Sequence, residues 1–175
     1  LEHWLERYQF PIPDEPVGTR ITLSMIARNE AEYLEECLKS VQGVVDEIVL
    51  VDTGSTDATP QIAEKYGAKV IYAEWQNDFA AARNIALQHA TGDWILVLDA
   101  DERLTPESKQ AILNAVRHPQ FVGYYLEILN EIGADNYFIH RLVRLFRRVP
   151  YARWEGAIHE QILPSLVSQK GRIAT

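Results

Sequence analysis

The sequence predicts an α/β fold, a mainly parallel sheet flanked by helices and followed by a short mixed α+β extension. Short apolar runs alternate with segments whose apolar residues recur at helical spacing, at intervals of about 25 residues. Helical crossovers are needed to join parallel strands, so this alternation indicates a parallel sheet wound right-handedly. After His118-Pro119 the alternation stops, and two β-rich stretches follow without a clear helix between them.

Each predicted element has a local cause. Apolar runs of four to seven residues predict strands at 21–27, 47–52, 69–72 and 94–98. Apolar spacing predicts a first helix over 30–41, and start and stop residues mark three more. These begin at Thr59-Pro60, Asp78 and Thr105-Pro106, and Gly67 and Gly92 end the first two. The β-rich stretches of the extension are 121–129 and 141–147.

Composition predicts one globular domain. The chain has 175 residues, of which 47% are hydrophobic and 24% charged, enough for a single core. We expect a proline-containing lead-in over 1–19 and a domain over 20–175. The chain stops at Thr175 without a terminus signal, so we expect it to be part of a longer protein, cut in its C-terminal half.

Charge and hydropathy exclude two classes of partner. A formal net charge of −8 argues against nucleic acid, which selects basic surfaces. No apolar run approaches the roughly 20 residues that cross a bilayer. We expect a cytoplasmic protein, with peripheral attachment to the inner face of the membrane left open, and an oligomeric state that the sequence does not reveal. The single cysteine, Cys37, lies on an apolar helix face and is expected to be buried.

The most informative feature is an acidic tip on a buried strand. Asp99-Ala100-Asp101, followed by Glu102, comes directly after the apolar run Trp94–Leu98. Open α/β sheets bind ligands at the carboxyl ends of their strands. Carboxylates without nearby cysteine or histidine suit Mg²⁺ or Mn²⁺, which share their coordination with substrate phosphates and water. The sequence therefore predicts a site for a metal–phosphate complex.

Two other strands end in polar clusters, at 27–30 and 52–57. In a parallel sheet these clusters and the acidic tip would share one edge, where a carboxylate could accept hydrogen bonds from a nucleotide base or ribose. Small residues around Gly54 would let the loop approach the ligand closely. Such residues also cap helices and form turns, which is the ordinary explanation of each cluster alone. Taken together they favour a nucleotide site.

Four strings resemble the family-two glycosyltransferases of the GT-A fold, particularly bacterial members similar to lipopolysaccharide-core transferases. They are ARNEAEYLEECLKSV, DEIVLVDTGSTDAT, DFAAARNIALQHATGDWILVLDADE and WEGAIHE, spread over about residues 21–160. The resemblance implies a nucleotide-sugar donor, usually a UDP-sugar, a Mn²⁺ or Mg²⁺ ion, and transfer with inversion to a hydroxyl acceptor that it does not identify: a glycan, a lipid or a protein.

The resemblance also implies residue roles. It places metal contacts at Asp101 and Asp99, with Asp101 preferred and Asp99 also on the ribose, and a possible third ligand at His159. Glu160 is the first choice for the general base and Glu155 the second, since a carboxylate there could take the acceptor's proton. The nucleotide-binding matches are Ala27, Arg28, Glu30, Asp52, Asp57, Arg83, Asn84 and Asp99.

Other functions remain open alternatives. A GT-A-like module could bind a nucleotide-sugar without turnover, and a sugar-phosphate nucleotidyltransferase would share the nucleotide site. The latter needs a glycine-rich basic loop after its first strand, which residues 27–30 do not provide. Asp52-Thr53-Gly54 resembles the aspartic-protease signature, but the strand–helix alternation opposes an all-β protease. One arginine among 141, 144, 147 and 148 could contact phosphate, and Trp154 could contact the acceptor.

Overall fold

A seven-stranded sheet forms the centre of the molecule. The computed structural model describes residues 18–131 and 137–175, and the strand order is β3-β2-β1-β4-β6-β5-β7. The strands are β1 Ile21–Ala27, β2 Glu47–Asp52, β3 Lys69–Tyr72, β4 Trp94–Val97, β5 Gly123–Glu131, β6 Tyr137–Arg147 and β7 Ile173–Ala174.

The first four strands are parallel, as the sequence predicts. Strand β1 pairs with β2 on one side and β4 on the other, and β2 also pairs with β3. The extension then adds β6 antiparallel to β4 and β5 antiparallel to β6. A sheet with this parallel half is incompatible with the all-β protease alternative.

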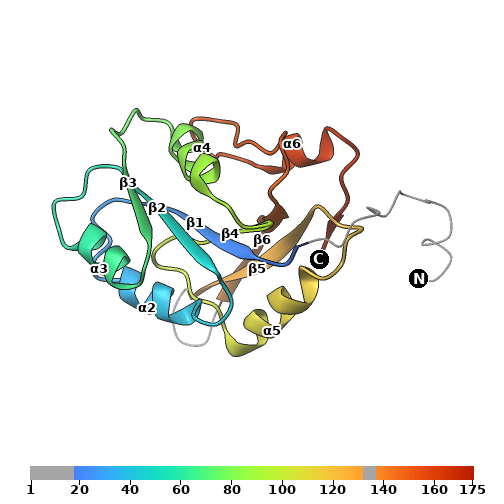
Figure 1. Cartoon of the computed structure of the whole chain (residues 1–175), viewed down its shortest axis with the longest axis horizontal. Helices are drawn as coiled ribbons and strands as arrows, with labels where there is room; N and C mark the ends of the chain where they lie inside the picture. Colours follow the sequence, from blue (N-terminus) through green and yellow to red (C-terminus); the bar gives the residue numbers. More distant parts are fainter. Residues whose placement is uncertain (1–17, 132–136) are drawn as a thin grey trace, which may run out of the picture.

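Helices cover both faces of the sheet. The helices are α2 Leu34–Ser40, α3 Thr59–Lys65, α4 Phe79–His89, α5 Pro106–Ala115 and α6 Leu163–Val167. Figure 1 shows α2, α3 and α5 on one face, with α4 and α6 on the other. Strands β1 and β4 are buried almost throughout, which explains why they read as nearly continuous apolar runs.

The described residues form two main apolar cores and a small third cluster of Val49, Val51 and Ala86. The larger contains Leu23, Leu96 and Leu145 of the sheet with Leu38 of α2 and Ile112 of α5. The smaller lies under α4 and α6 and includes Ile95, Phe146, Trp154 and Leu166. Cys37 is fully buried in the larger core, as predicted, and burial raises the pKa of its thiol to about 12.

The cap predictions for α4 and α5 are confirmed. The Asp78 side chain accepts a hydrogen bond from the Ala81 N–H at 2.8 Å, and Thr105 accepts one from the Ser108 N–H at 3.2 Å. Each bond satisfies one of the N–H groups that a helix start leaves without a partner.

The first predicted helix is shorter than expected. It begins at Leu34 rather than Glu30, after turns over residues 31–33. The cause is tertiary: the Glu30 N–H donates to the Thr59 hydroxyl at 2.8 Å and the Ala31 N–H to Asp57 at 3.1 Å. The predicted lead-in, 1–19, lies outside the described residues as far as residue 17. Helix α6 and strand β7 were not predicted.

Replacing either cap should cost a similar amount of stability. We expect Asp78→Ala and Thr105→Ala each to lower the free energy of unfolding by about 1 kcal/mol, because each removes one cap hydrogen bond. Urea unfolding measures both, with an unchanged m-value as the control for an intact fold. A neutral Asp78→Ala would mean that α4 does not depend on this cap.

Candidate functional site

The acidic strand ends gather at the carboxyl edge of the sheet. Strand β1 lies between β2 and β4, and Ala27 is level with Asp52 in the register. The pKa of Glu30, just beyond β1, is raised by partial burial and by the negative charges of Asp101, Asp57 and Asp99. Carboxylates from three separate strand ends therefore influence one another at this edge.

The loops after β1 and β2 are bound to each other. The Asn29 N–H donates to the Ser55 hydroxyl at 2.9 Å, and the Asn29 side-chain oxygen accepts from the Thr56 N–H at 2.7 Å. Asn29 adopts a left-handed φ of 58°, a conformation that asparagine tolerates better than most residues. Arg28 is exposed beside this contact.

Asp57 serves this loop contact. One of its oxygens accepts from the Thr59 N–H and hydroxyl, at 2.9 and 2.5 Å, and the other accepts from the Ala31 N–H. These bonds, that of the Thr59 hydroxyl first, lower the pKa of the Asp57 carboxyl. Both carboxylate oxygens are thus engaged within the protein.

Asp52 is buried at the end of β2 with one oxygen engaged. Its Oδ2 accepts from the N–H groups of Gly54 and Ser55, at 3.2 and 3.1 Å. Its Oδ1 is buried and has no hydrogen-bond partner. Gly54 adopts φ 103°, and a Cβ built on it would meet no atom within 4 Å, so the loop is open at this residue.

Asp99 is held between two buried arginines. Arg83 Nη2 donates to its Oδ1 at 2.8 Å, and Arg144 Nη2 donates to its Oδ2 at 2.9 Å. Burial alone would raise the pKa of Asp99, but the charges and hydrogen bonds of Arg144 and Arg83 outweigh it and lower the pKa to about 2. Asp99 is therefore ionised over the whole physiological pH range.

Arg83 connects Asp99 to the predicted base. Its Nε donates to Glu160 Oε1 at 2.7 Å, and its guanidinium lies 5.1 Å from the centre of the Trp154 ring. The side chains of Arg83 and Glu160 are only 7% and 15% exposed. Glu160 thus lies one guanidinium away from Asp99, in a setting that excludes most water.

The segment 154–160 is fastened to α4 through its backbone. Asn84 donates to the Trp154 carbonyl at 3.0 Å and accepts from the Trp154 N–H at 2.8 Å, and the Phe79 N–H donates to the Ala157 carbonyl. Asn84 therefore holds the segment that carries Glu160. Trp154 itself is buried against Phe146, so stacking on an acceptor is not open to it in this arrangement.

Glu155 and His159 lie at the outside of this segment. Glu155 accepts from Arg153 Nε at 2.8 Å, and it borders a hollow of about 450 Å³ that Tyr151, Arg153 and Ser165 also line. His159 is exposed, with a left-handed φ of 57°. The side chains of Asp99, Arg83, Arg144, Glu102 and Glu160 form one set of ion pairs, here called the Asp99 cluster. The two alternatives for the base thus differ in setting: Glu160 belongs to this cluster, whereas Glu155 borders an open hollow.

The residues at the edge fit a hard cation only in part. Asp101 is exposed, and in the described residues it forms no ion pair. Within ranges 18–131 and 137–175, no group of three or more His, Cys, Asp or Glu could hold a metal by itself, so His159 does not join the two aspartates in such a group. One or two carboxylates completed by substrate phosphates and water is nevertheless how Mg²⁺ is usually bound.

Sequence reasoning missed two members of the Asp99 cluster. Arg144 and Glu102 form a 2.8 Å ion pair, and Glu102 Oε2 accepts from the Asp99 N–H at 2.8 Å. Glu102 directly follows the Asp-x-Asp motif, which is the one signal the sequence carried. Arg144 was visible only as one of four arginines that could contact phosphate.

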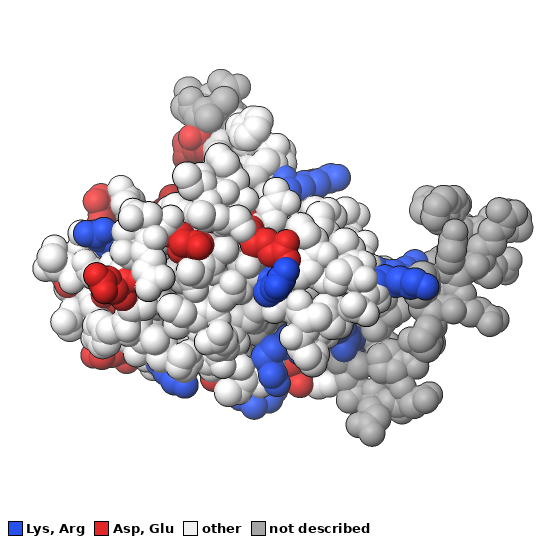
Figure 2. Space-filling model, turned by 90° about the horizontal axis from the view of Figure 1, so that it is seen from above, with Lys and Arg blue, Asp and Glu red and all other residues white. Residues whose placement is uncertain are grey.

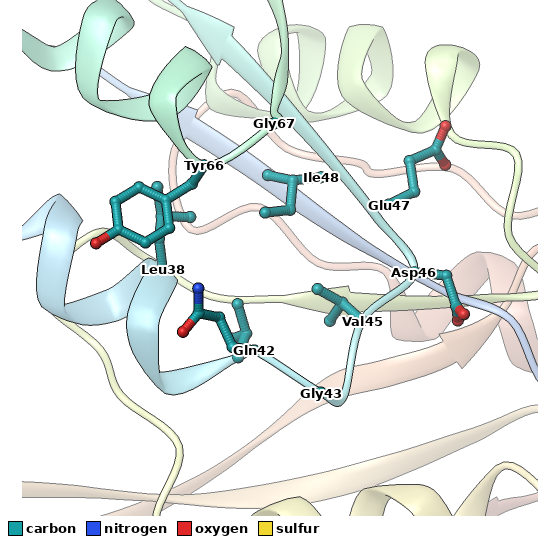
Figure 3. Close-up of a pocket in the computed structure, with 10 residues that line it drawn as sticks. Leu38, Gln42, Gly43, Val45, Asp46, Glu47, Ile48, Tyr66 and Gly67 are labelled. Atoms are coloured by element: carbon teal, nitrogen blue, oxygen red, sulfur yellow. The ribbon is translucent and has the colours of Figure 1, made fainter.

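The surface carries two further features. Figure 2 shows acidic and basic side chains scattered over a mostly uncharged face on the α4 and α6 side of the molecule. A hollow of about 270 Å³ opens at the opposite, amino end of the sheet, where Leu38, Ile48 and Tyr66 converge (Figure 3). Its lining residues include none of the predicted site residues.

Comparison with known proteins identifies the family. The family model described as glycosyl transferase family 2 matches residues 22–163. The chain belongs to glycosyl transferase family 2. A TPR repeat-containing protein of Synechococcus elongatus is 44% identical over 149 residues, and the match covers 85% of this chain and 37% of that protein. Glycosyltransferase SunS of Bacillus subtilis is 33% identical, over 81% of this chain and 34% of SunS. The family-2 domain thus spans about a third of these relatives.

Solved structures support the GT-A fold of the family-2 domain. Staphylococcus aureus TarS, residues 1–349, superposes with a TM-score of 0.55 at 29% identity, over 67% of this chain and 38% of that one. The complex of TarS with UDP gives a TM-score of 0.52 at 26% identity over the same shares. The mannosyltransferase PcManGT from Pyrobaculum calidifontis, in complex with GDP-Man and Mn²⁺, also gives 0.52 at 26%, over 70% and 39%.

Helix length and hydropathy bear on the prediction that the protein has no transmembrane segment. None of the helices formed by residues 18–131 and 137–175 is long and apolar enough to cross a membrane. The finer resemblance to lipopolysaccharide-core transferases stays a prediction.

Neutralising Glu30 should stabilise the family-2 domain in a pH-dependent way. Because the folded state raises the pKa of Glu30, its ionisation opposes folding: the loss of stability begins as the pH rises above the unfolded pKa and is complete above the folded pKa. We expect Glu30→Gln to raise Tm at pH 7 and to have almost no effect below the unfolded pKa of about 4.3. Thermal unfolding across pH measures this, and an equal gain at both ends would contradict the charge explanation.

Proposed function

We propose that this family-2 domain transfers a sugar from a UDP-sugar to a hydroxyl acceptor with inversion, assisted by Mn²⁺ or Mg²⁺. The observation that carries the proposal is the meeting of acidic ends from β2 and β4 on either side of β1, with Asp52 and Asp101 at the same sheet edge. The nucleotides bound in the TarS and PcManGT complexes support a nucleotide donor.

Asp52 is proposed to recognise the base. Its Oδ1 is a buried acceptor without a donor, which costs free energy that a base N–H would recover. Uracil offers its N3–H to such an acceptor, whereas cytosine presents a bare N3 at that position. The oxygen is shielded from solvent, so binding requires the loop after β2 to move, and Gly54 at φ 103° is suited to that motion. Arg28 and Glu30 lie on the adjoining loop and are proposed to contact the nucleotide from the β1 side. Ala27, the last residue of β1, is proposed to contact it through its backbone.

The diphosphate is proposed to lie between Asp101 and Arg83. Asp101 would be the main ligand of the cation and Asp99 the second. The cation would neutralise charge that develops on the leaving diphosphate. The α4 N-terminus, four residues before Arg83, would add a favourable dipole for anionic groups. His159 stays a proposed further contact to the cation or the diphosphate.

Glu160 is the proposed general base, with Glu155 as the alternative. The base takes the proton from the acceptor hydroxyl, and the resulting oxygen attacks the anomeric carbon from the face opposite the leaving diphosphate, which inverts the configuration. Glu160 can accept that proton only if the acceptor approaches the side of its carboxylate not used by Arg83. Glu155 is more accessible but farther from the described cluster.

A single-turnover experiment separates transferase from binding module. Labelled UDP-sugars are incubated with the domain, Mn²⁺ and a simple alcohol such as glycerol as acceptor, and release of UDP and the anomeric form of the glycoside are followed. Turnover to an inverted product supports the proposal. Tight UDP binding without any turnover by the intact protein would favour a nucleotide-sugar-binding module. Formation of UTP and a sugar 1-phosphate when pyrophosphate is added would favour a nucleotidyltransferase.

Asp52→Asn should change the base preference. The amide keeps an oxygen for Gly54 and Ser55 but turns a donor toward the base, which opposes uracil N3–H and suits cytosine N3. We expect UDP affinity to fall by about tenfold or more and the preference for UDP over CDP to narrow or reverse. Isothermal titration measures both, with Asp46→Asn, at the far end of β2, as the matched control. An unchanged UDP/CDP ratio would refute this role.

Asp101→Ala should remove the metal-dependent part of UDP binding. We expect Mn²⁺ to strengthen UDP binding in the wild type and to lose at least about tenfold of that effect in the variant, while binding in EDTA is unchanged. The control is Glu107→Ala, which removes an equally exposed charge from the first turn of α5. If Mn²⁺ enhanced UDP binding equally in all three proteins, the cation would lie elsewhere.

A further inference from the structure

Arg144 lies at an irregularity of the β5–β6 ladder. Tyr124 pairs with Leu145 and Tyr125 with Val143, so the register passes over Arg144 and leaves it without a partner on β5. Such bulges frequently redirect a side chain next to a functional site. Here the side chain reaches Asp99 and Glu102, which follow β4.

The contacts of Arg144 close a ring around the Asp-x-Asp turn. Arg144 Nη2 donates to both Asp99 Oδ2 and Glu102 Oε1, at 2.9 and 2.8 Å. Glu102 Oε2 in turn accepts from the Asp99 N–H at 2.8 Å, and the Glu102 N–H donates to the Asp99 carbonyl at 3.0 Å. Both ends of the turn are thus fixed to one guanidinium, and Asp101 lies between them.

Burial distinguishes this ion pair from an ordinary surface one. The Arg144 side chain is 8% exposed and that of Glu102 18%, whereas Arg141 of β6 and its partner Glu127 of β5 are 59% and 52% exposed. Surface pairs contribute little, but a buried arginine without its carboxylates is strongly destabilising. Its two acidic partners engage Nη2 within the protein, while the buried Nε of Arg144 has no hydrogen-bond partner.

We propose that Arg144 is a positioning residue for donor binding, which aims Asp101 at the cation and diphosphate by holding the turn from Asp99 to Glu102. The inference rests on the proposed function and adds a residue from the antiparallel extension to the donor site. Arg144 touches neither the donor nor the cation. Its effect is transmitted through Asp99 and Glu102. Removing Arg144 should therefore reduce the Mn²⁺-dependent gain in UDP affinity, as removing the Asp101 carboxylate does, and leave base recognition at Asp52 intact.

The test compares Arg144→Lys and Arg144→Met with the matched surface variant Arg141→Met. UDP binding is measured by titration calorimetry with saturating Mn²⁺ and with EDTA, and thermal unfolding of each ligand-free protein is recorded in parallel. We expect Arg144→Met to lose about tenfold or more of the Mn²⁺-dependent gain in UDP affinity, with little change in EDTA. Arg144→Lys should recover part of it, because the charge returns without the two-acid geometry. Arg141→Met should behave as wild type.

Glu102→Gln provides a second route if Arg144→Met does not fold. It breaks the same ring while keeping an oxygen for the Asp99 N–H, and we expect the same selective loss. Variants that unfold at lower temperature but keep the full Mn²⁺-dependent gain would overturn the positioning role and leave the proposed function standing. A wild-type protein that binds no UDP under either condition would overturn the proposed function and this inference with it.

Discussion

The Asp99 carboxylate, held between the guanidinium groups of Arg83 and Arg144, is the interaction on which the arrangement of the site depends. These three side chains come from the end of β4, from α4 and from β6, so one carboxylate joins the parallel half of the sheet to its antiparallel extension. Glu160 and Glu102 extend the cluster on either side. Buried charges are tolerated only when paired, so removing Arg83 would leave Glu160 without its ion-pair partner, and removing Arg144 would do the same to Glu102. The cluster carries three acids and two arginines, and this excess of negative charge suits the cation binding proposed for this edge.

The parallel half of the fold could be predicted because its signals are local. Apolar runs, the Asp78 and Thr105 caps and the closing glycines each act within a few residues, and the corresponding elements agree with the structure. The start of α2 could not be predicted in the same way, because Glu30 and Ala31 bond to Thr59 and Asp57, nearly thirty residues away. The bulge at Arg144 depends on how β5 pairs with β6, and a single sequence does not specify that register.

The candidate site shows the same division. Residue types at strand ends predicted one shared edge, and the structure brings these acids to it, since the carboxyl ends of neighbouring parallel strands must meet; the roles of the acids stay a prediction. The sequence did not reveal which side-chain atoms are free to bind a ligand. The resemblance predicts nucleotide contacts for Asp57 and Asn84, yet their polar atoms bond to neighbouring segments of the chain, and Trp154 is buried beneath Arg83. Asp52 Oδ1, the exposed Asp101 and the buried Nε of Arg144 are among the groups that the internal contacts leave available. That difference between engaged and available groups requires the tertiary structure.

The claim that Asp52 and Asp101 bind parts of one ligand can be tested directly. The measurement is the paramagnetic broadening of backbone amide signals by Mn²⁺, with and without UDP. With UDP present, the account predicts the strongest broadening at Glu30, Asp101 and Glu102, shift changes at Gly54 and Ser55 in a diamagnetic Mg²⁺ control, and no effect at residues 43–47 on the opposite edge. Broadening centred on another part of the molecule would contradict the account. So would Mn²⁺ broadening and UDP-induced shift changes that occur in two separate regions of the surface.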